Sequence, residues 1–347
     1  MRRISLTNVI FLVFLLCGCG TTYHYTEFLK PSNRYVPSNI YVVGVLQRST
    51  TQNSVCPVYL DGIPYGKIEE VPFRAANLAI DNLKNLCEGI GRFKFVSISV
   101  NDTVPNEGEF ATKKLSNSEI QELTVQHNLD GIISLDGQDM LIRTSGSVSV
   151  VSVDDGSGMP SQVPEFSKES QVSMSLLWRF YDCSSGQMID EYQESYERFF
   201  SRVSFSEEEI QEFKDEDMGL MDISGMAAYD YFERISPHWE PDYRQYFNTG
   251  SDELVLISEK LELTGDWEEA AQSWLKLTSS DDPKIRHKAC FNMALASEIL
   301  GQPRVAKEWI TKAKLTNPTK RTLKYEELID RQILIYEVVN SQLGITG

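Results

Sequence analysis

The side chains best suited to metal binding or nucleophilic chemistry are scattered along this chain. Its histidines are His24, His127, His238 and His287, and its cysteines beyond residue 19 are Cys56, Cys87, Cys183 and Cys290. None of these residues has a partner at the spacing of a zinc or thioredoxin-like site. The sequence also lacks a serine nucleophile elbow, a phosphate-binding loop and a dinucleotide fingerprint. It therefore predicts no metal, no cofactor and no catalytic residue, and leaves the disulfide pairing of the cysteines open.

Three aspartates offer the remaining route to a site built from distant segments. If Asp136, Asp139 and Asp182 converge in a polar cleft, the amino-terminal domain would hold an enzyme or carbohydrate-binding site. The acid-rich stretches 154–158 and 207–217 do not follow the alternating ligand pattern of an EF-hand. We interpret the first stretch as a hairpin loop and the second as the acidic start of a helix. An enzyme is thus the alternative and not the leading hypothesis.

The beginning of the chain predicts export and lipidation. An apolar run at residues 9–16 follows Arg2 and Arg3, and it is shorter than the roughly 20 residues that cross a bilayer as a helix. Leu-Cys-Gly-Cys, residues 16–19, then resembles the lipobox of bacterial lipoproteins. This resemblance implies a signal peptide at residues 1–18 and a Cys19 that carries fatty acids such as palmitate.

The residues after Cys19 indicate where such a lipoprotein would be sorted. Gly20 follows Cys19 where inner-membrane lipoproteins have aspartate, so the resemblance implies the bacterial outer membrane. Residues 20–26 contain no acidic cluster of the kind that marks surface export, which favours the periplasmic face. The net charge of −17 over 347 residues argues against nucleic acid as a partner, because that partner requires a basic surface.

Sequence patterns divide the chain into segments. Residues 19–38, which are rich in proline and serine, are predicted to be a lipidated tether. An α+β domain is expected at residues 39–204 and a helical junction at 205–248. Tetratricopeptide-like helical repeats are expected at residues 249–347.

The predicted α+β domain combines two buried strands with two helices and long hairpins. Apolar runs at residues 40–46 and 131–135 indicate strands that are buried on both faces. Apolar residues spaced three and four apart from Phe73 to Cys87 predict a helix that Gly89 and Gly91 end, and a Ser116–Glu119 capping box predicts a second helix. From residue 145 to 200, alternating patterns predict antiparallel strands around a loop at 154–167. The domain is therefore expected to be a mixed sheet with two helices and long antiparallel hairpins.

The carboxy-terminal part contains an internal repeat. An offset of 36 residues carries Gly265, Ala270 and Trp274 onto Gly301, Ala306 and Ile310. The second copy, residues 291–318, resembles a tetratricopeptide repeat in the order of its large, small and turn residues. The resemblance implies an all-α domain of helical hairpins that binds proteins.

Aromatic residues near these repeats are the candidate partner-binding residues. Trp239 and Tyr243 lie in the predicted junction, and Trp267 directly follows the predicted inter-helix turn, where we expect it to be exposed. These side chains would line a groove for a peptide. The alternative is that they fill the repeat core and the seam before it.

The motifs together resemble a known family. The lipobox, the two buried strands, the hairpin at 178–192 and the repeat at 291–318 resemble an uncharacterised family of bacterial outer-membrane-type lipoproteins. The amino-terminal order of elements and the turn at 181–186 are also similar to curli-secretion-type lipoproteins and penicillin-binding-protein activators, which implies protein binding or assembly.

These observations lead to one hypothesis and two alternatives. The leading hypothesis is a non-enzymatic, lipid-anchored envelope adaptor that binds a protein partner through its helical repeats. The first alternative is the enzyme or carbohydrate-binding lipoprotein described above. The second is an oligomeric secretion or assembly component built by the amino-terminal domain.

Overall fold

The computed structural model describes residues 20–50, 54–99, 110–154, 156, 160–212 and 214–345. The chain forms two compact units. Among the described residues, the sheet domain comprises 32–238 with 342–345, and the helical domain comprises 20–31 with 239–341. This order of a mixed sheet with helices followed by a helical region confirms the predicted fold class. The predicted signal peptide and Cys19 lie outside the described residues.

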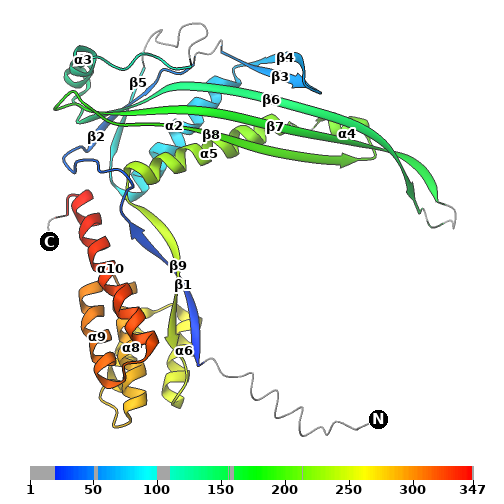
Figure 1. The fold of residues 1–347 in the computed structure, drawn as a ribbon. Helices are drawn as coiled ribbons and strands as arrows, with labels where there is room; N and C mark the ends of the chain where they lie inside the picture. Colours follow the sequence, from blue (N-terminus) through cyan, green and yellow to red (C-terminus); the bar gives the residue numbers. More distant parts are fainter. Residues whose placement is uncertain are drawn as a thin grey trace. The chain divides into compact units, whose positions relative to one another are not determined.

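The sheet domain is built on one mixed sheet (Figure 1). Its strands are β2 (Val42–Gln47), β3 (Val55–Leu60), β4 (Ile63–Glu69), β5 (Lys94–Ile98), β6 (Gly131–Val153), β7 (Ser161–Asp182) and β8 (Met188–Ser204). The order is β4-β3-β6-β2-β5, with β7 paired to the other edge of β6 and β8 paired to β7. The β2 strand runs parallel to β5 and β6, whereas β6, β7 and β8 are antiparallel.

Helices cover both faces of this sheet. The helices α2 (Val71–Ile90) and α5 (Asp215–Ile235) pack against each other on one face of the sheet. The helix α3 (Asn117–His127) lies on the other face (Figure 1). Successive β2 residues serve opposite faces: Val45 belongs to the core under α2 and α5, and Leu46 to the core under α3. The continuous apolar run therefore reflects burial on both sides, as expected for a central parallel strand.

Both predicted helices of this domain form, and their predicted ends are confirmed. The Ser116 side chain accepts from the Glu119 N–H, while the Glu119 carboxylate accepts from the Ser116 N–H. This reciprocal capping box begins α3. The α2 helix ends at Gly91, whose φ of 74° places it in the left-handed region that glycine adopts without strain.

Some elements are longer than the sequence predicts. The two expected strands at 131–135 and 147–153 are parts of the single strand β6, which pairs with β7 from Gly131 to Val153. The β7 strand begins at Ser161, inside the stretch expected to be a loop. A short helix, α4 (Glu207–Glu212), precedes α5. The α5 helix begins at Asp215, where the buried carboxylate pairs with Lys168 and Arg202 of the neighbouring strands.

The helical domain contains two helical hairpins and a final helix. These elements are α6 (Asp252–Thr264), α7 (Trp267–Leu277), α8 (Pro283–Ile299), α9 (Pro303–Thr316) and α10 (Lys320–Gln342). The hairpin turns contain Gly265 and Gly301, with φ of 67° and 72°. The internal repeat of the sequence thus corresponds to two helix–turn–helix units. Within the described part of the chain, no helix is both long and apolar enough to cross a membrane.

A two-stranded ribbon replaces part of the predicted tether and part of the predicted helical junction. The strands β1 (Thr21–Lys30) and β9 (His238–Phe247) pair with each other. Contacts of Gly20 with Asn248, Tyr25 with Tyr243 and Lys30 with Glu240 show that they run antiparallel. The prediction of a free tether over residues 19–38 is therefore wrong over β1, and the prediction of a helical junction over 205–248 is wrong over β9. The pairing joins segments more than 200 residues apart, which no local pattern reveals.

Candidate functional site

The structure separates the three predicted partner-binding aromatics. Trp239 and Tyr243 of β9 are 52% and 64% exposed, as expected for contact residues. Trp267 is only 8% exposed, so the prediction that it is exposed is wrong. The rings of His24, Tyr246 and Trp274 pack around it, with centroids between 4.7 and 6.1 Å away. Trp267 is therefore part of the core that holds the ribbon on the helices.

The three aspartates of the enzyme hypothesis do not form a site. The β6–β7 register places Asp182 opposite Gly131, five residues along β6 from Asp136, or about 16 Å at the rise of a strand. Asp139 is exposed, whereas Asp136 is buried. The Asp182 carboxylate accepts hydrogen bonds from Ser184 and Ser185 and closes the turn between β7 and β8. Among the described residues, no group of histidine, cysteine, aspartate or glutamate side chains is placed to hold a metal.

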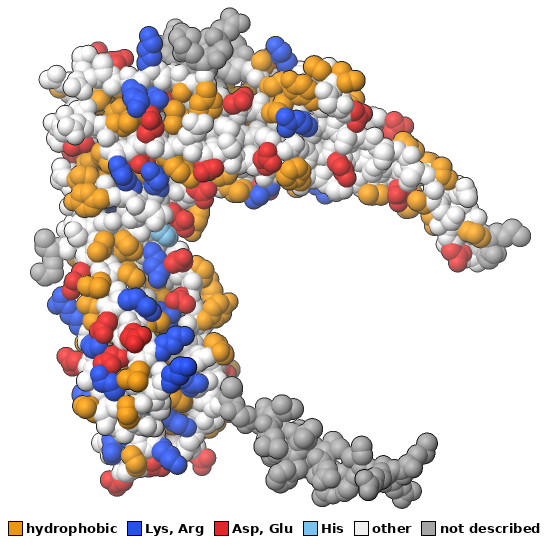
Figure 2. All heavy atoms as spheres, in the orientation of Figure 1, with side chains coloured by type: hydrophobic (Ala, Val, Ile, Leu, Met, Phe, Trp, Pro, Cys, Tyr) orange, Lys and Arg blue, Asp and Glu red, His pale blue; other side chains and the backbone are white. Residues whose placement is uncertain are grey.

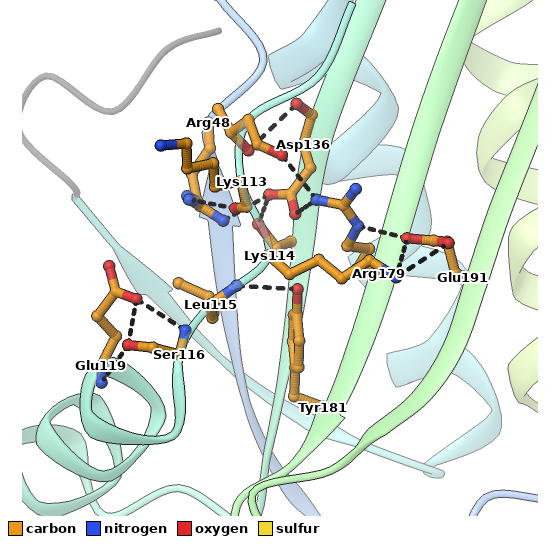
Figure 3. Close-up of polar contacts among 12 residues, drawn as sticks. Arg48, Lys113, Lys114, Leu115, Ser116, Glu119, Asp136, Arg179, Tyr181 and Glu191 are labelled. Carbon is orange, nitrogen blue, oxygen red and sulfur yellow. Dashed lines mark hydrogen bonds and ion pairs between the residues drawn. The ribbon is translucent and has the colours of Figure 1, made fainter.

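Asp136 instead anchors a buried polar cluster (Figure 3). Arg48 Nη1 donates to its Oδ1 at 2.9 Å, and Arg179 Nη1 donates to its Oδ2 at 2.8 Å. Ser134 also donates to Oδ1. The Asp136 side chain is fully excluded from solvent, and those of both arginines are no more than 8% exposed. Its charge is thus compensated by two guanidinium groups, as a buried carboxylate requires.

The same arginines fasten the segment before α3 to the sheet. Arg48 donates to the carbonyl oxygen of Lys113, and Arg179 donates to that of Thr112. The Leu115 N–H donates to the hydroxyl of Tyr181, whose pKa is raised by burial and by the charge of Asp136 (Figure 3). We interpret this cluster as a structural clamp, because its carboxylate and guanidinium groups bind one another and the backbone carbonyls of residues 112 and 113.

A mostly apolar cavity lies within the helical domain. It has a volume of about 190 Å³ and is lined by residues of β1, β9, α8, α9 and α10. Most of its wall is apolar, with side chains that include Phe28, Leu29, Trp239, Ile299, Ile335 and Val339. Of the predicted aromatics, Trp239 lines this cavity, while Tyr243 contacts Tyr25 elsewhere on the ribbon. We call this cavity the ribbon pocket.

The charge of Glu298 at the ribbon pocket is balanced by Arg244 of the same domain. Glu298 lines the pocket, and its carboxylate accepts from Arg244 Nη2 at 2.9 Å and from the Tyr325 hydroxyl at 2.5 Å. Burial opposes the charge of Arg244, but the hydrogen bonds that it donates to Glu298 and Asp242, together with their negative charges, outweigh this effect and raise the pKa of the guanidinium. The Arg244 guanidinium also lies over the Phe28 ring, 4.3 Å from its centroid. The pocket therefore offers a ligand an apolar wall without a free charge at Glu298.

Sequence reasoning found one residue of this pocket and missed the others. Phe28 and Leu29 were assigned to the tether because their strand partner lies far away in the sequence. Ile335 and Val339 are four residues apart on α10, which brings them to one face of the helix. This spacing of four residues was the only sign of the pocket in α10, and apolar residues that pack inside a helical domain show the same spacing.

The fold and the pocket define a two-domain protein that combines an α+β sheet domain with a helical-hairpin domain containing an apolar pocket. The chain belongs to the family described as "Domain of unknown function (DUF8603)", whose family model matches residues 40–247. A second family model, "Domain of unknown function (DUF6340)", matches residues 258–332. None of the curated proteins matches the chain.

Solved structures resemble the chain only slightly. A candidate homolog of the neuraminyllactose-binding hemagglutinin from Helicobacter pylori is 14% identical with a TM-score of 0.26, over 60% of this chain and 96% of that one. The PelC dodecamer from Paraburkholderia phytofirmans is 11% identical with a TM-score of 0.22, over 61% and 97%. A DUF330 protein from Xanthomonas campestris is 8% identical with a TM-score of 0.22, over 58% and 94%. Likeness at this level does not indicate a shared function.

Proposed function

We propose that the protein is a lipid-anchored adaptor of the cell envelope that binds a protein partner through the ribbon pocket. The observation that carries this proposal is the pocket, with the half-exposed Trp239 in a mostly apolar wall. Tryptophan and tyrosine are enriched among interface residues that contribute most to binding. The partner would place an apolar side chain in the pocket and contact Trp239 around it.

The size of the pocket favours a side chain over a cofactor. Small-molecule sites typically have volumes of about 300–1,000 Å³. The ribbon pocket has about 190 Å³, which suits one large apolar side chain better than a whole cofactor. The net charge of −17 makes a polyanionic partner unfavourable.

The experiment that tests this proposal is site-specific photo-crosslinking in intact cells. A photo-reactive residue replaces Trp239, and the matched control places it at Leu315, which is 80% exposed on α9 and does not line the pocket. We expect one recurrent envelope protein to be captured from position 239 and not from position 315. The additional change Ile335→Glu, which puts a charge in the pocket, should abolish that capture without unfolding the domain.

Other results would contradict the proposal. Capture of the same set of proteins from both positions would show contact by proximity alone. Capture that persists in the Ile335→Glu variant, with circular dichroism unchanged, would show that the partner does not use the pocket.

The membrane anchor belongs to the same proposal and is supported by the lipobox-like residues that end at Cys19. Each methylene buried in a bilayer contributes about 0.8 kcal/mol, so several acyl chains would hold the protein firmly. We place it at the outer membrane, facing the periplasm. Mass spectrometry of the mature amino terminus should find an acylated Cys19, lost in Cys19→Ala and retained in Cys17→Ala. An unmodified Cys19 would disprove the anchor and leave the pocket proposal intact.

The three aspartates proposed for an enzyme or carbohydrate-binding site give that alternative no support, because they do not converge. It depended on the convergence of Asp136, Asp139 and Asp182, and these side chains occupy a buried clamp, an exposed strand position and a turn. We therefore propose an adaptor without catalysis.

A further inference from the structure

The outer part of β6 has an unpaired edge. On one side β6 pairs with β7 over its whole length. On the other side it pairs with β2 at 131–135 and with β3 at 142–144. Beyond Thr144, no described strand pairs with this second edge. The segment 145–153 therefore presents unused backbone donors and acceptors along one side, and Figure 1 shows it extending past the ends of β3 and β4.

This edge lacks the features that normally prevent strands from pairing between molecules. Natural edge strands are protected by charged side chains, prolines or bulges. Residues 145–153 read Ser-Gly-Ser-Val-Ser-Val-Val-Ser-Val and contain neither a charge nor a proline. By contrast β8, the outer strand beyond β7, has charged residues at Glu191, Glu194, Glu197, Arg198 and Arg202. Figure 2 shows mostly hydrophobic and uncharged atoms over the outer part of the sheet.

The unprotected segment is complementary to itself. An antiparallel pair of two such segments centred on Ser149 would place Val148 of each copy opposite Val150 of the other. Both valines are about two-thirds exposed, at 64% and 66%. The β6–β7 register puts Phe166 and Pro164 beside them on the same face. Pairing would therefore join two small apolar patches as well as two rows of backbone groups.

We propose that two copies of this chain associate through residues 145–153 of β6, antiparallel about a two-fold axis at Ser149. A second copy fits this edge because the pairing opposes no like charges, although the chain as a whole has a net charge of −17. Two-fold pairing also uses the same segment on both copies and consumes both free edges, so the assembly stops at a dimer. This surface lies in the sheet domain, and its use is independent of the ribbon pocket.

The first test measures the mass of the full mature chain by sedimentation over a range of concentrations. We expect a dimer that dissociates on dilution. Val150→Lys, which adds a protecting charge at the edge, should weaken the dimer about tenfold or more. The matched control is Val203→Lys on β8, which is 61% exposed and away from the β6 edge, and it should leave the dimer intact.

The second test reads the register directly. In the proposed pair, Ser149 lies opposite its own counterpart, with Cβ atoms about 4.5–5.5 Å apart, a distance that a disulfide can bridge after slight adjustment. Ser149→Cys should therefore form a disulfide-linked dimer under mild oxidation, whereas Ser147→Cys, which faces Val151 of the other copy, should not. The unmodified chain, which retains Cys56, Cys87, Cys183 and Cys290, provides the background.

Each other outcome overturns the proposal. A monomer at every concentration would show that a second copy does not occupy this edge. Equal crosslinking at positions 147 and 149, or assembly that grows beyond a dimer, would exclude the two-fold register. Equal loss of the dimer with Val203→Lys would place the interface elsewhere.

Discussion

Arg244 and Glu298 form a buried ion pair in the helical domain, with Nη2 and Oε1 2.9 Å apart and both side chains no more than 3% exposed. The pair joins β9 to α8, and the Tyr325 hydroxyl adds a hydrogen bond from α10. It therefore links the ribbon to two helices beside the ribbon pocket.

We predict that Glu298→Gln destabilises the helical domain by about 3 kcal/mol, because it removes the buried carboxylate that faces Arg244 and leaves only the 43% exposed Asp242 as its ionic partner. Calorimetry of the full chain should show a lower melting temperature for the transition of this domain. The matched control is Arg304→Leu, which removes the exposed pair between Arg304 and Glu337 and should cost no more than about 1 kcal/mol. Equal effects would show that burial of the Arg244–Glu298 pair does not matter.

A second prediction concerns the buried clamp of the sheet domain. Asp136→Asn should destabilise this domain by about 3–5 kcal/mol, since Arg48 and Arg179 then face each other without a carboxylate between them. Hydrogen exchange should also become faster at residues 112–115, which these arginines hold. Glu191→Gln, at a side chain 37% exposed, is the control and should cost less than about 1 kcal/mol. A stable Asp136→Asn variant with slow exchange would refute the structural role of the clamp.

Two glycines of α5 should respond in opposite directions to the same substitution. A Cβ on Gly219 would lie 2.8 Å from Cβ and Cγ2 of Val172 on β7, so Gly219→Ala should cost about 1–3 kcal/mol. A Cβ on Gly225 would meet nothing within 4 Å, and Gly225→Ala should stabilise the helix by about 0.5–1 kcal/mol. Urea unfolding of both variants measures these effects. Stabilisation by both alanines would mean that α5 does not approach β7 this closely.

The helical domain should lose stability in acid partly through Glu326. Hydrogen bonds from Lys314 and Lys307 lower the pKa of this carboxyl below its ordinary value of 4.5. A carboxyl with a lowered folded pKa binds protons more weakly in the folded than in the unfolded chain. Its stabilisation is therefore present above about pH 4.5 and is lost as the pH falls through the lowered folded pKa.

This dependence is measured as the melting temperature of the helical domain between pH 7 and pH 3. Glu326→Gln should lower the melting temperature at pH 7 and reduce its fall below pH 4.5. The neighbouring exposed Glu327→Gln is the control and should keep the fall of the original chain. A steeper fall in Glu326→Gln would reverse the assigned direction of the pKa shift.

The sequence predicted local structure correctly where a pattern of neighbouring residues indicated a buried face or a helix end. The alternating residues Val172, Met174, Leu176, Trp178 and Phe180 are all buried in the core on one side of the sheet. The Ser116–Glu119 capping box and the Gly91 helix end are also present as predicted. In each case the pattern lies within a short stretch of the chain, so the local sequence is enough to reveal it.

What the sequence missed depends on contacts between distant segments. Residues 21–30 were interpreted as a tether, because the strand that pairs with them begins at residue 238. Trp267 was expected to be exposed after a turn, but His24 of that same strand packs against its ring. The ribbon pocket could not be predicted for the same reason, since β1 and β9 form one of its walls.

The pairing of β1 also determines how far the helical domain could extend from a bilayer. A flexible segment of about 20 residues would span as much as roughly 65–70 Å. In the structure, the Gly20 carbonyl already accepts from the Asn248 N–H, one residue after Cys19. If Cys19 carries the proposed acyl groups, the flexible segment between the anchor and the folded domain is about one residue long, or roughly 4 Å. The attachment point of the helical domain would then stay within a few ångströms of the lipid, and the domain would meet its partner by diffusion in the plane of the membrane.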